Sequence, residues 1–487
     1  MKIDKSKIIR VVLALGILHF AYLFSTYAQE TPPAPAAPKS VRIPAVLEKI
    51  LANNLTVAVI ERKTAPLVTI QLVVKSGAET EKVEKAGLAN LTASLLTKGT
   101  KTRTATDIAE QLEFLGGSIN SGAGWNNTAI SITITSDKLE QALAIMSDVV
   151  LYPNFEQKEI DLLKTQTLDG LTYNLKQPGF LANYVASAYS FGEHPASGTP
   201  ASINLIKREN ITEFHQKNFQ PQNSVLIFTG DIVATKANAL AKQYFGKWEN
   251  KSKNNPTVFK NVGKKNQEAK RILVVDLPNS GQAAVNYTKN LQGVPRIKQN
   301  LFFSATVLNS LLGGGYSSRL NQEIRIKRGL SYGAGSSFAW RVGYSNFGTR
   351  TQTKNESAAE VAELVLAEVN KLADGSIAES ELMPRKSVLT GSFGRNLETT
   401  QGLAAAVADL YSFGLPTSEL NSYMNNVQTV SDQQIKNFAA ANLMGGDIVI
   451  VGDYAKFKDD LAKRFPNLKI KVIKADEVDL SKENLRK

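Results

Sequence analysis

The chain carries one sequence unit twice, and a repeat of this length sets the architecture of the whole fold. Residues 211–248 and 434–465 each begin with an amphipathic helix pattern, pass through a β-rich run to Gly-Asp, and end in a helix containing Leu-Ala-Lys. The tetrapeptide Tyr-Ser-Phe-Gly precedes both copies, at residues 189–192 and 411–414. The repeat therefore predicts two homologous domains.

Matching segments upstream of each copy extend the repeat over most of the chain. A strand-like segment is followed by an amphipathic helix at residues 67–74 and 86–96, and again at residues 283–287 and 301–312. We predict an α+β fold of two homologous domains, each a mostly antiparallel sheet covered by helices. Their predicted ranges are 41–249 and 271–475, with a Lys- and Asn-rich linker at 250–270 and a polar tail at 476–487.

The first 40 residues have the pattern of an export signal followed by a spacer. A basic start, an apolar run at residues 11–24 and Thr-Tyr-Ala at 26–28 predict a signal peptide at residues 1–28. The apolar run is shorter than the roughly 20 residues that span a bilayer, so we expect no stable membrane span once it is removed. Residues 29–40 are a Pro/Ala-rich spacer. A periplasmic location is the main expectation, with an extracellular or signal-anchored one left open.

The composition excludes most catalytic classes. The chain has no Cys and only 3 His among 487 residues, which excludes disulfide scaffolds, iron–sulfur clusters and Cys-ligated zinc. After export only His194 and His215 remain, too far apart for HExxH or HxxEH. We expect His194 in a surface turn and His215 in helix packing or at the surface. The net charge of +13 is spread over the chain, so we expect no nucleic-acid function.

One segment of the first half nevertheless matches a known catalytic helix. Residues 87–100, GLANLTASLLTKGT, resemble the zinc-binding helix of the pitrilysin/insulinase metallopeptidases, where GLAHFLEHMLFKGT is typical. The resemblance places Asn90 and Ser94 at the two zinc-binding His positions and Ala93 at the catalytic Glu position. It therefore implies a degenerate zinc site that binds no metal in this chain.

The family's third zinc ligand is also missing. In the family this ligand is a Glu that lies a fixed number of residues after the second His and before a Pro. Counting from Ser94 and counting back from Pro178 both lead to Gly170, with Asp169 beside it. One displaced carboxylate cannot hold zinc by itself.

The second half departs much less from the family. Residues 317–332 resemble the family's SSRLxxxLRExxGLAY segment, and this implies functional roles for Arg325 and Tyr332. In the family these two side chains hold the substrate backbone and stabilise the oxyanion at a zinc in the opposite domain or subunit. From the residues alone, Arg325 would form a surface ion pair with Glu323 or a neighbour, and Tyr332 would be a half-buried aromatic residue in a strand. The intact register favours the functional interpretation.

Two segments are predicted to contact peptide. The first is a flexible, aromatic-tipped segment before the Arg/Tyr pair, for which a plain helix-to-loop break is the alternative. The second resembles the family's GGxxNA edge strand, which receives a substrate backbone by β-augmentation, although it could equally be an ordinary strand. The residues concerned are Gly313, Gly314, Gly315 and Tyr316 in the first, and Asn120 and Ser121 in the second.

The resemblance implies a metal-free, catalytically incomplete subunit that is not active alone. Similar chains pair with an HxxEH-bearing subunit of the same family, as in mitochondrial processing peptidase and in bacterial heterodimers. In such a pair this chain would form half of a peptide-enclosing chamber and supply Arg325 and Tyr332 to the partner's zinc site. Two alternatives remain: a binding or scaffolding protein, as a homodimer or in an envelope complex, and an enzyme with other chemistry.

Overall fold

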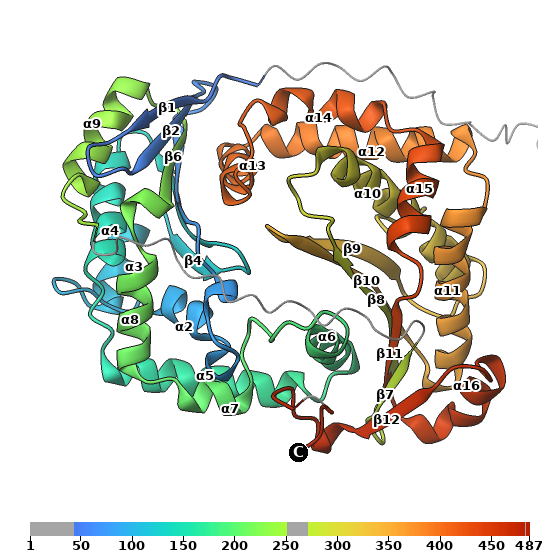
Figure 1. Cartoon of the computed structure of the whole chain (residues 1–487). Coiled ribbons are helices and arrows are strands. Elements are labelled where there is room, and N and C mark those ends of the chain that lie inside the picture. Colours follow the sequence, from blue (N-terminus) through green and yellow to red (C-terminus); the bar gives the residue numbers. More distant parts are fainter. Residues whose placement is uncertain (1–42, 251–270, 483) are drawn as a thin grey trace, which may run out of the picture. The chain divides into compact units, whose positions relative to one another are not determined.

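A computed structural model describes residues 43–250 and 271–487 apart from residue 483 (Figure 1). The predicted signal peptide, the spacer and all but the first residue of the predicted linker lie outside the described residues. No helix within the described ranges is both long enough and apolar enough to span a bilayer.

The first half contains a six-stranded sheet in the order β1-β2-β6-β3-β5-β4. Four of its five strand pairings are antiparallel, and β2 with β6 is the parallel one. Its strands are β1 (Leu47–Ile50), β2 (Thr56–Glu61), β3 (Leu67–Val74), β4 (Ile119–Ala123), β5 (Thr128–Thr135) and β6 (Ser224–Gly230). Its helices are α2 (Leu88–Leu95), α3 (Ala105–Phe114), α4 (Leu139–Leu151), α5 (Gln157–Asn174), α6 (Pro178–Tyr189), α7 (Pro200–Leu205), α8 (Arg208–Asn218) and α9 (Ala234–Phe245).

The second half contains an equivalent sheet in the order β12-β7-β11-β8-β10-β9, with three of five pairings antiparallel. Its strands are β7 (Ile272–Asp276), β8 (Ala283–Gln292), β9 (Ala334–Trp340), β10 (Tyr344–Thr353), β11 (Asp447–Gly452) and β12 (Ile470–Lys474). Its helices are α10 (Gln299–Leu312), the π-helix η4 (Asn321–Ile326), α11 (Ala358–Asp374), α12 (Glu379–Leu397), α13 (Thr400–Ser412), α14 (Glu419–Gln428), α15 (Asp432–Asn442) and α16 (Lys458–Arg464).

The repeated units of the sequence become the same element in both halves. Each supplies a fully buried central strand, β6 or β11, flanked by a parallel and an antiparallel neighbour. The strand before each amphipathic helix is also equivalent, being β3 before α2 and β8 before α10. The predicted α+β fold of two homologous, mostly antiparallel sheets with helices is therefore confirmed.

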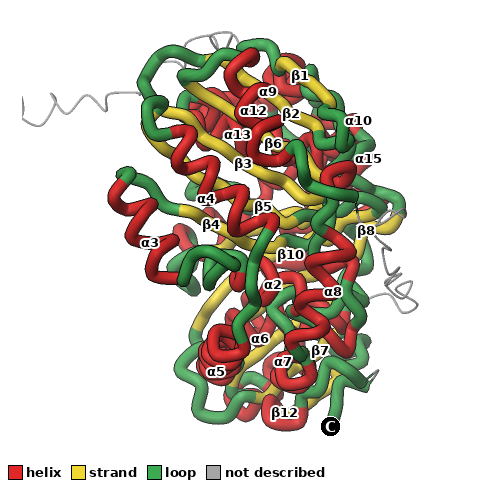
Figure 2. Tube along the Cα trace, turned by 90° about the vertical axis from the view of Figure 1, so that its left-hand side faces the viewer, coloured by secondary structure: helices red, strands yellow, loops and turns green. Residues whose placement is uncertain are grey.

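The two halves exchange one helix each, which the repeat did not predict. Helix α6 of the first half packs on β8 and β11, while α13 of the second half packs on β3 and β6. On the first sheet, alternate residues such as Ile60 and Val73 contact Leu403 and Val407 of α13. The intervening residues face a separate core under α4 and α9, which cover that part of the first sheet in Figure 2. Each sheet is thus completed by the other half, so the halves share their hydrophobic cores.

Candidate functional site

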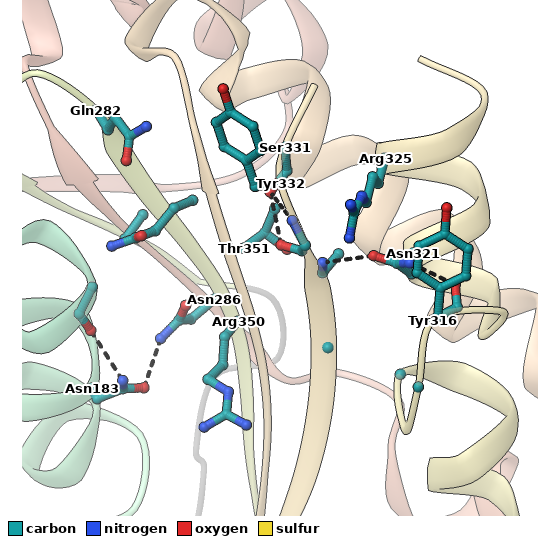
Figure 3. A pocket seen from close by; sticks show the side chains of 18 of the residues that line it. Asn183, Gln282, Asn286, Tyr316, Asn321, Arg325, Ser331, Tyr332, Arg350 and Thr351 are labelled. Atoms are coloured by element: carbon teal, nitrogen blue, oxygen red, sulfur yellow. Dashed lines mark hydrogen bonds between the residues drawn. The ribbon is translucent and has the colours of Figure 1, made fainter. Parts of the chain in front are cut away.

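The predicted Arg325 and Tyr332 line one hollow of about 720 Å³ beside the second sheet (Figure 3). Its wall comes from the start of α6, from strands β8, β9 and β10, and from the segment around the π-helix. Of the residues predicted to contact peptide in this half, Gly313, Gly315 and Tyr316 line the same hollow, whereas Gly314 is not part of its wall.

Arg325 is carried by the π-helix η4, a backbone form that is rare and occurs mostly at functional sites. The Nδ2 of Asn321 donates to the carbonyl of Tyr316 at 2.5 Å, and its Oδ1 accepts from the backbone N–H of Ala334 at 3.4 Å. Gly329, with φ 65°, then turns the chain out of the helix toward Tyr332. One buried asparagine therefore links the segments that carry both functional side chains.

Arg325 is positioned without an acidic partner. Its guanidinium lies over the ring of Tyr316, 5.1 Å from the centroid. The neighbouring Glu323 pairs instead with Lys327 at 2.9 Å and with Arg328. Within the described part of the chain Arg325 forms no ion pair, so its charge is available to a ligand. The surface ion pair that the sequence alone favoured is not the one that forms.

Tyr332 is 90% exposed and lies in the loop that precedes β9. It is therefore neither in a strand nor half-buried, contrary to the interpretation from the residues alone. A tyrosine hydroxyl held on such a loop can donate to an oxygen of a bound molecule.

The glycines before the π-helix have two different roles. A Cβ on Gly313 would lie 2.2 Å from the backbone nitrogen of Ser336, and one on Gly314 would lie 2.7 Å from the Cα of Ser310. These two positions allow the end of α10 to pass close to its neighbours. A Cβ on Gly315 would meet nothing nearer than 4.0 Å, so only this glycine leaves open space in the wall.

The degenerate zinc position lies in the first half, on α2 and α5, which pack together. Asn90 is exposed, Ser94 is half-buried and Ala93 is buried, while a Cβ on Gly170 would meet nothing within 4 Å. Across the residues that the structure describes, no three His, Cys, Asp or Glu side chains come together in a way that could hold a metal ion. An amide, a hydroxyl, a methyl group and a glycine do not fit zinc, whose protein ligands are imidazole, thiolate and carboxylate.

Restoring the three ligand types should create zinc binding, because the frame of α2 and α5 is kept. We expect Asn90→His/Ser94→His/Gly170→Glu to bind about one zinc ion per chain, since positions 90 and 94 share one helix face and position 170 is unobstructed. Metal analysis after dialysis against a weak chelator measures this. The control is Asn90→His alone, which should retain none; equal zinc in both variants would contradict the assignment.

The predicted edge strand is β4, the outermost strand of the first sheet. Among the described strands it pairs with β5 alone, so one row of its backbone groups is left for another strand. The side chain of Asn120 is exposed, and the Ser121 hydroxyl donates to the carbonyl of Ala93 at 2.7 Å. The structure thus brings the edge strand to the degenerate helix, while neither is part of the hollow around Arg325.

A buried acid that the sequence analysis did not identify supports the N-terminus of the degenerate helix. The Glu81 carboxylate accepts from the backbone N–H groups of Gly87 at 2.8 Å and Ala89 at 2.7 Å. The nearest ring nitrogen of His194 is 3.5 Å from the same carboxylate. This acid keeps α2 in place although the zinc ligands are gone.

The prediction that His194 lies in a surface turn is wrong. Its side chain is buried, because the ring lies 5.0 Å from that of Trp125 and Nε2 is 3.2 Å from the carbonyl oxygen of Ala78. The turn itself exists at Gly192, with φ 65°, but it directs the chain inward. For His215 the sequence left two options, helix packing or the surface. Its ring packs against those of Phe155 and Phe219, which is the first of the two.

The buried acids make stability depend on pH. Burial raises the pKa of Glu81 to about 8 and that of Glu79 to about 7, from ordinary values of 4.5. A raised pKa means that folding favours the neutral acid, so this stabilisation is present below about pH 4.5 and is lost as the pH rises through 7 to 8. Burial lowers the pKa of His194, which has the opposite effect at acid pH.

Glu81→Gln isolates the contribution of Glu81. Between about pH 5 and pH 8 the free energy of unfolding of the wild type should fall by about 3 to 4 kcal/mol more than that of the variant. Urea denaturation at a series of pH values measures both. Parallel pH profiles would show that Glu81 is ionised in the folded chain at all these pH values.

Two family models match the chain. The model described as "Insulinase (Peptidase family M16)" matches residues 56–188, and the one described as "Peptidase M16 inactive domain" matches residues 206–389. The two matches reach into both halves of the chain and leave residues 390–487 unmatched.

Relatives and solved structures agree with these matches. The chain is 27% identical over 415 residues to "Non-peptidase homolog YmxG" of Helicobacter pylori, covering 82% of this chain and 91% of that one. It is 27% identical over 372 residues to an uncharacterized zinc protease of Mycobacterium leprae, covering 74% and 81%. A crystal structure of a peptidase M16 inactive domain from Pseudomonas fluorescens superposes with a TM-score of 0.75 at 26% identity, covering 84% of this chain and 98% of that one. A protease from Helicobacter pylori has the same fold, with a TM-score of 0.77 at 22% identity over 84% of this chain and 100% of that one.

Proposed function

Because the chain belongs to peptidase family M16 and is a catalytically incomplete member of it, we propose that it acts as the metal-free subunit of a heterodimeric zinc peptidase. In this role it helps to enclose and hold the peptide and supplies Arg325 and Tyr332 to the zinc site of an HxxEH-bearing partner. The observation that carries the proposal is an asymmetry: every zinc and base position lacks its functional group, while Arg325 lines an open hollow and forms no ion pair with any residue that the structure describes.

The two retained side chains suit the stabilisation of negative charge. An arginine is always charged and presents several N–H donors, and a tyrosine hydroxyl adds another. Donors fixed before the reaction and aimed at a developing oxyanion are among the largest contributions to catalysis by enzymes of this chemical type. Ala93 stands at the position of the family's catalytic Glu, which is why the proposal assigns activation of the attacking water to the partner.

The location of the proposed complex follows from the signal-like N-terminus. We place the mature subunit in the periplasm, where a partner and peptide substrates would be met after export.

A second candidate function is favoured by one relative. The protein from Helicobacter pylori is named a non-peptidase homologue, and a chain of that kind could bind or scaffold without any part in proteolysis. The two candidates differ in the need for Arg325, which a scaffold would not require.

Capture of the complex tests the proposal. The tagged full chain is expressed in its native cells and purified without crosslinking, and the companions are identified by mass spectrometry. The proposal expects a companion in about equal amount that contains HxxEH. Recovery of the bait alone, as a dimer of itself, would favour the scaffolding role.

A further inference from the structure

The hollow around Arg325 contains two arginines and no acid. Its wall includes Arg325 and Arg350, whereas none of its lining residues is Asp or Glu. Arg350 is exposed on β10, and in the described part of the chain it makes no salt bridge. The hollow therefore presents two cations with no acid in its wall.

Side-chain amides surround Arg350 and add neutral hydrogen-bonding groups. Strand pairing places Arg350 beside Asn286 of β8, and the amides of Asn286 and Asn183 are 2.9 Å apart and hydrogen-bonded (Figure 3). Gln282 and Gln352 line the same region. Asn183 and Asn286 are hydrogen-bonded to each other, so beside them the guanidinium of Arg350 is the charged group that faces the hollow.

The start of α6 contributes further donors to this wall. Gly179 and Phe180 line the hollow and lie in the first turn of the helix, where backbone N–H groups have no helical acceptor. The N-cap residue Gln177 makes no capping hydrogen bond through its side chain. These donors and the positive end of the helix dipole favour an anionic group in the same hollow that Arg350 lines.

We propose that this hollow is a carboxylate-selective subsite in which Arg350 binds an acidic group of an extended peptide. The substrate class is a peptide that carries a carboxylate, either on an Asp or Glu side chain or at its C-terminus. Arg350 acts here as a specificity residue, distinct from Arg325, which the proposed function reserves for the reacting peptide bond. The inference rests on the proposed function only in taking the ligand to be a peptide.

A guanidinium suits this role because it can donate two parallel hydrogen bonds to one carboxylate. Such charge-assisted pairs are stronger than neutral hydrogen bonds, and loss of one typically weakens binding about 10- to 100-fold. A lysine at the same place would keep the charge but lose the bidentate geometry. We therefore expect Arg350→Lys to retain part of the preference for acidic peptides and Arg350→Gln to lose it.

The test is direct peptide binding to the isolated full chain, without any partner, by fluorescence anisotropy. Four labelled peptides of one sequence differ only in a central Glu or Gln and in a free or amidated C-terminus. The wild type should bind a carboxylate-bearing peptide about 10- to 100-fold more tightly than the peptide with both groups neutralised. The peptide that carries only the Glu and the peptide that carries only the free C-terminus show which of the two carboxylates the site binds.

Two variants make the outcome specific to this site. Arg350→Gln should lower the preference for the carboxylate-bearing peptide by at least about tenfold, while Arg395→Gln, at an exposed arginine on α12 outside the hollow, should leave that preference within about twofold of the wild type. Equal binding of acidic and neutral peptides by the wild type, or an equal loss with both variants, would overturn the inference. Because no partner is present in this experiment, these results would stand even if the heterodimer proposal failed. Equal binding of acidic and neutral peptides would likewise leave the heterodimer proposal standing.

Discussion

Replacing Arg325 by alanine is expected to lower the kcat of the assembled peptidase about 100- to 1,000-fold, which is the usual cost of losing one preorganised oxyanion donor. The expectation follows from the position of Arg325 in an open hollow, over the Tyr316 ring and without an acidic partner. Because the side chain is exposed, the variant should fold as well as the wild type. Steady-state hydrolysis of a quenched fluorescent peptide by the pair measures the effect.

The matched control is Arg328→Ala. Arg328 lies only three positions further along the chain but is paired with Glu323 and is not part of the hollow. Its loss should change kcat less than about twofold. Tyr332→Phe, which removes only the hydroxyl, should lower kcat as well. Full activity of the Arg325→Ala pair would show that the Arg/Tyr pair is unused and would favour the scaffolding role.

The second large effect is expected at Glu193, which holds the two halves together. Its carboxylate accepts from Arg341 Nε at 3.0 Å and Nη2 at 3.1 Å, and also from the Tyr344 hydroxyl and the Asn346 amide, both at 2.7 Å. The side chain of Glu193 is only 5% exposed, and that of Arg341 only 16%. Glu193→Ala leaves a largely buried cation unpaired, so it should lower the free energy of unfolding by about 3–5 kcal/mol.

Urea denaturation followed by tryptophan fluorescence measures this loss. Arg341 also lies over the ring of Trp125, 5.0 Å from its centroid, so this fluorophore reports on the contact. Glu110→Ala, an exposed acid on α3, is the control and should stay within about 0.5 kcal/mol of the wild type. A loss below about 1 kcal/mol at Glu193 would mean that the halves are joined mainly by the exchanged helices.

The architecture was predictable where sequence periodicity decides it. The β-rich run of each repeated unit was predicted and forms β6 or β11, and the structure adds that both strands are buried and lie inside their sheets. The exchange of α6 and α13 could not be predicted, because an apolar helix face shows that a helix is buried but not which sheet covers it. Contacts between segments far apart in the sequence decide which sheet covers the helix. One example is the pair Thr69 of β3 and Thr400 of α13, whose hydroxyl oxygens are 2.9 Å apart.

The candidate site was predictable only through the family motif. Arg325 and Tyr332 come from its register, whereas Arg350 lies in a strand where an isolated arginine looks like an ordinary solvent-facing residue. Because residues two apart in a strand share a face, the sequence indicated only that Arg350 and Gln352 lie on the same side of the sheet. His194 was misplaced because Gly and Pro nearby predict a turn, while its burial depends on Trp125, which is distant in the sequence.

Reconstitution from separate subunits tests the central claim most directly. The chain and its HxxEH-bearing companion are purified apart, and peptide hydrolysis is measured while one is titrated into the other. The account predicts that neither is active alone and that activity rises to a plateau at about one chain per companion. Full activity of the companion by itself, or hydrolysis by this chain alone, would contradict it.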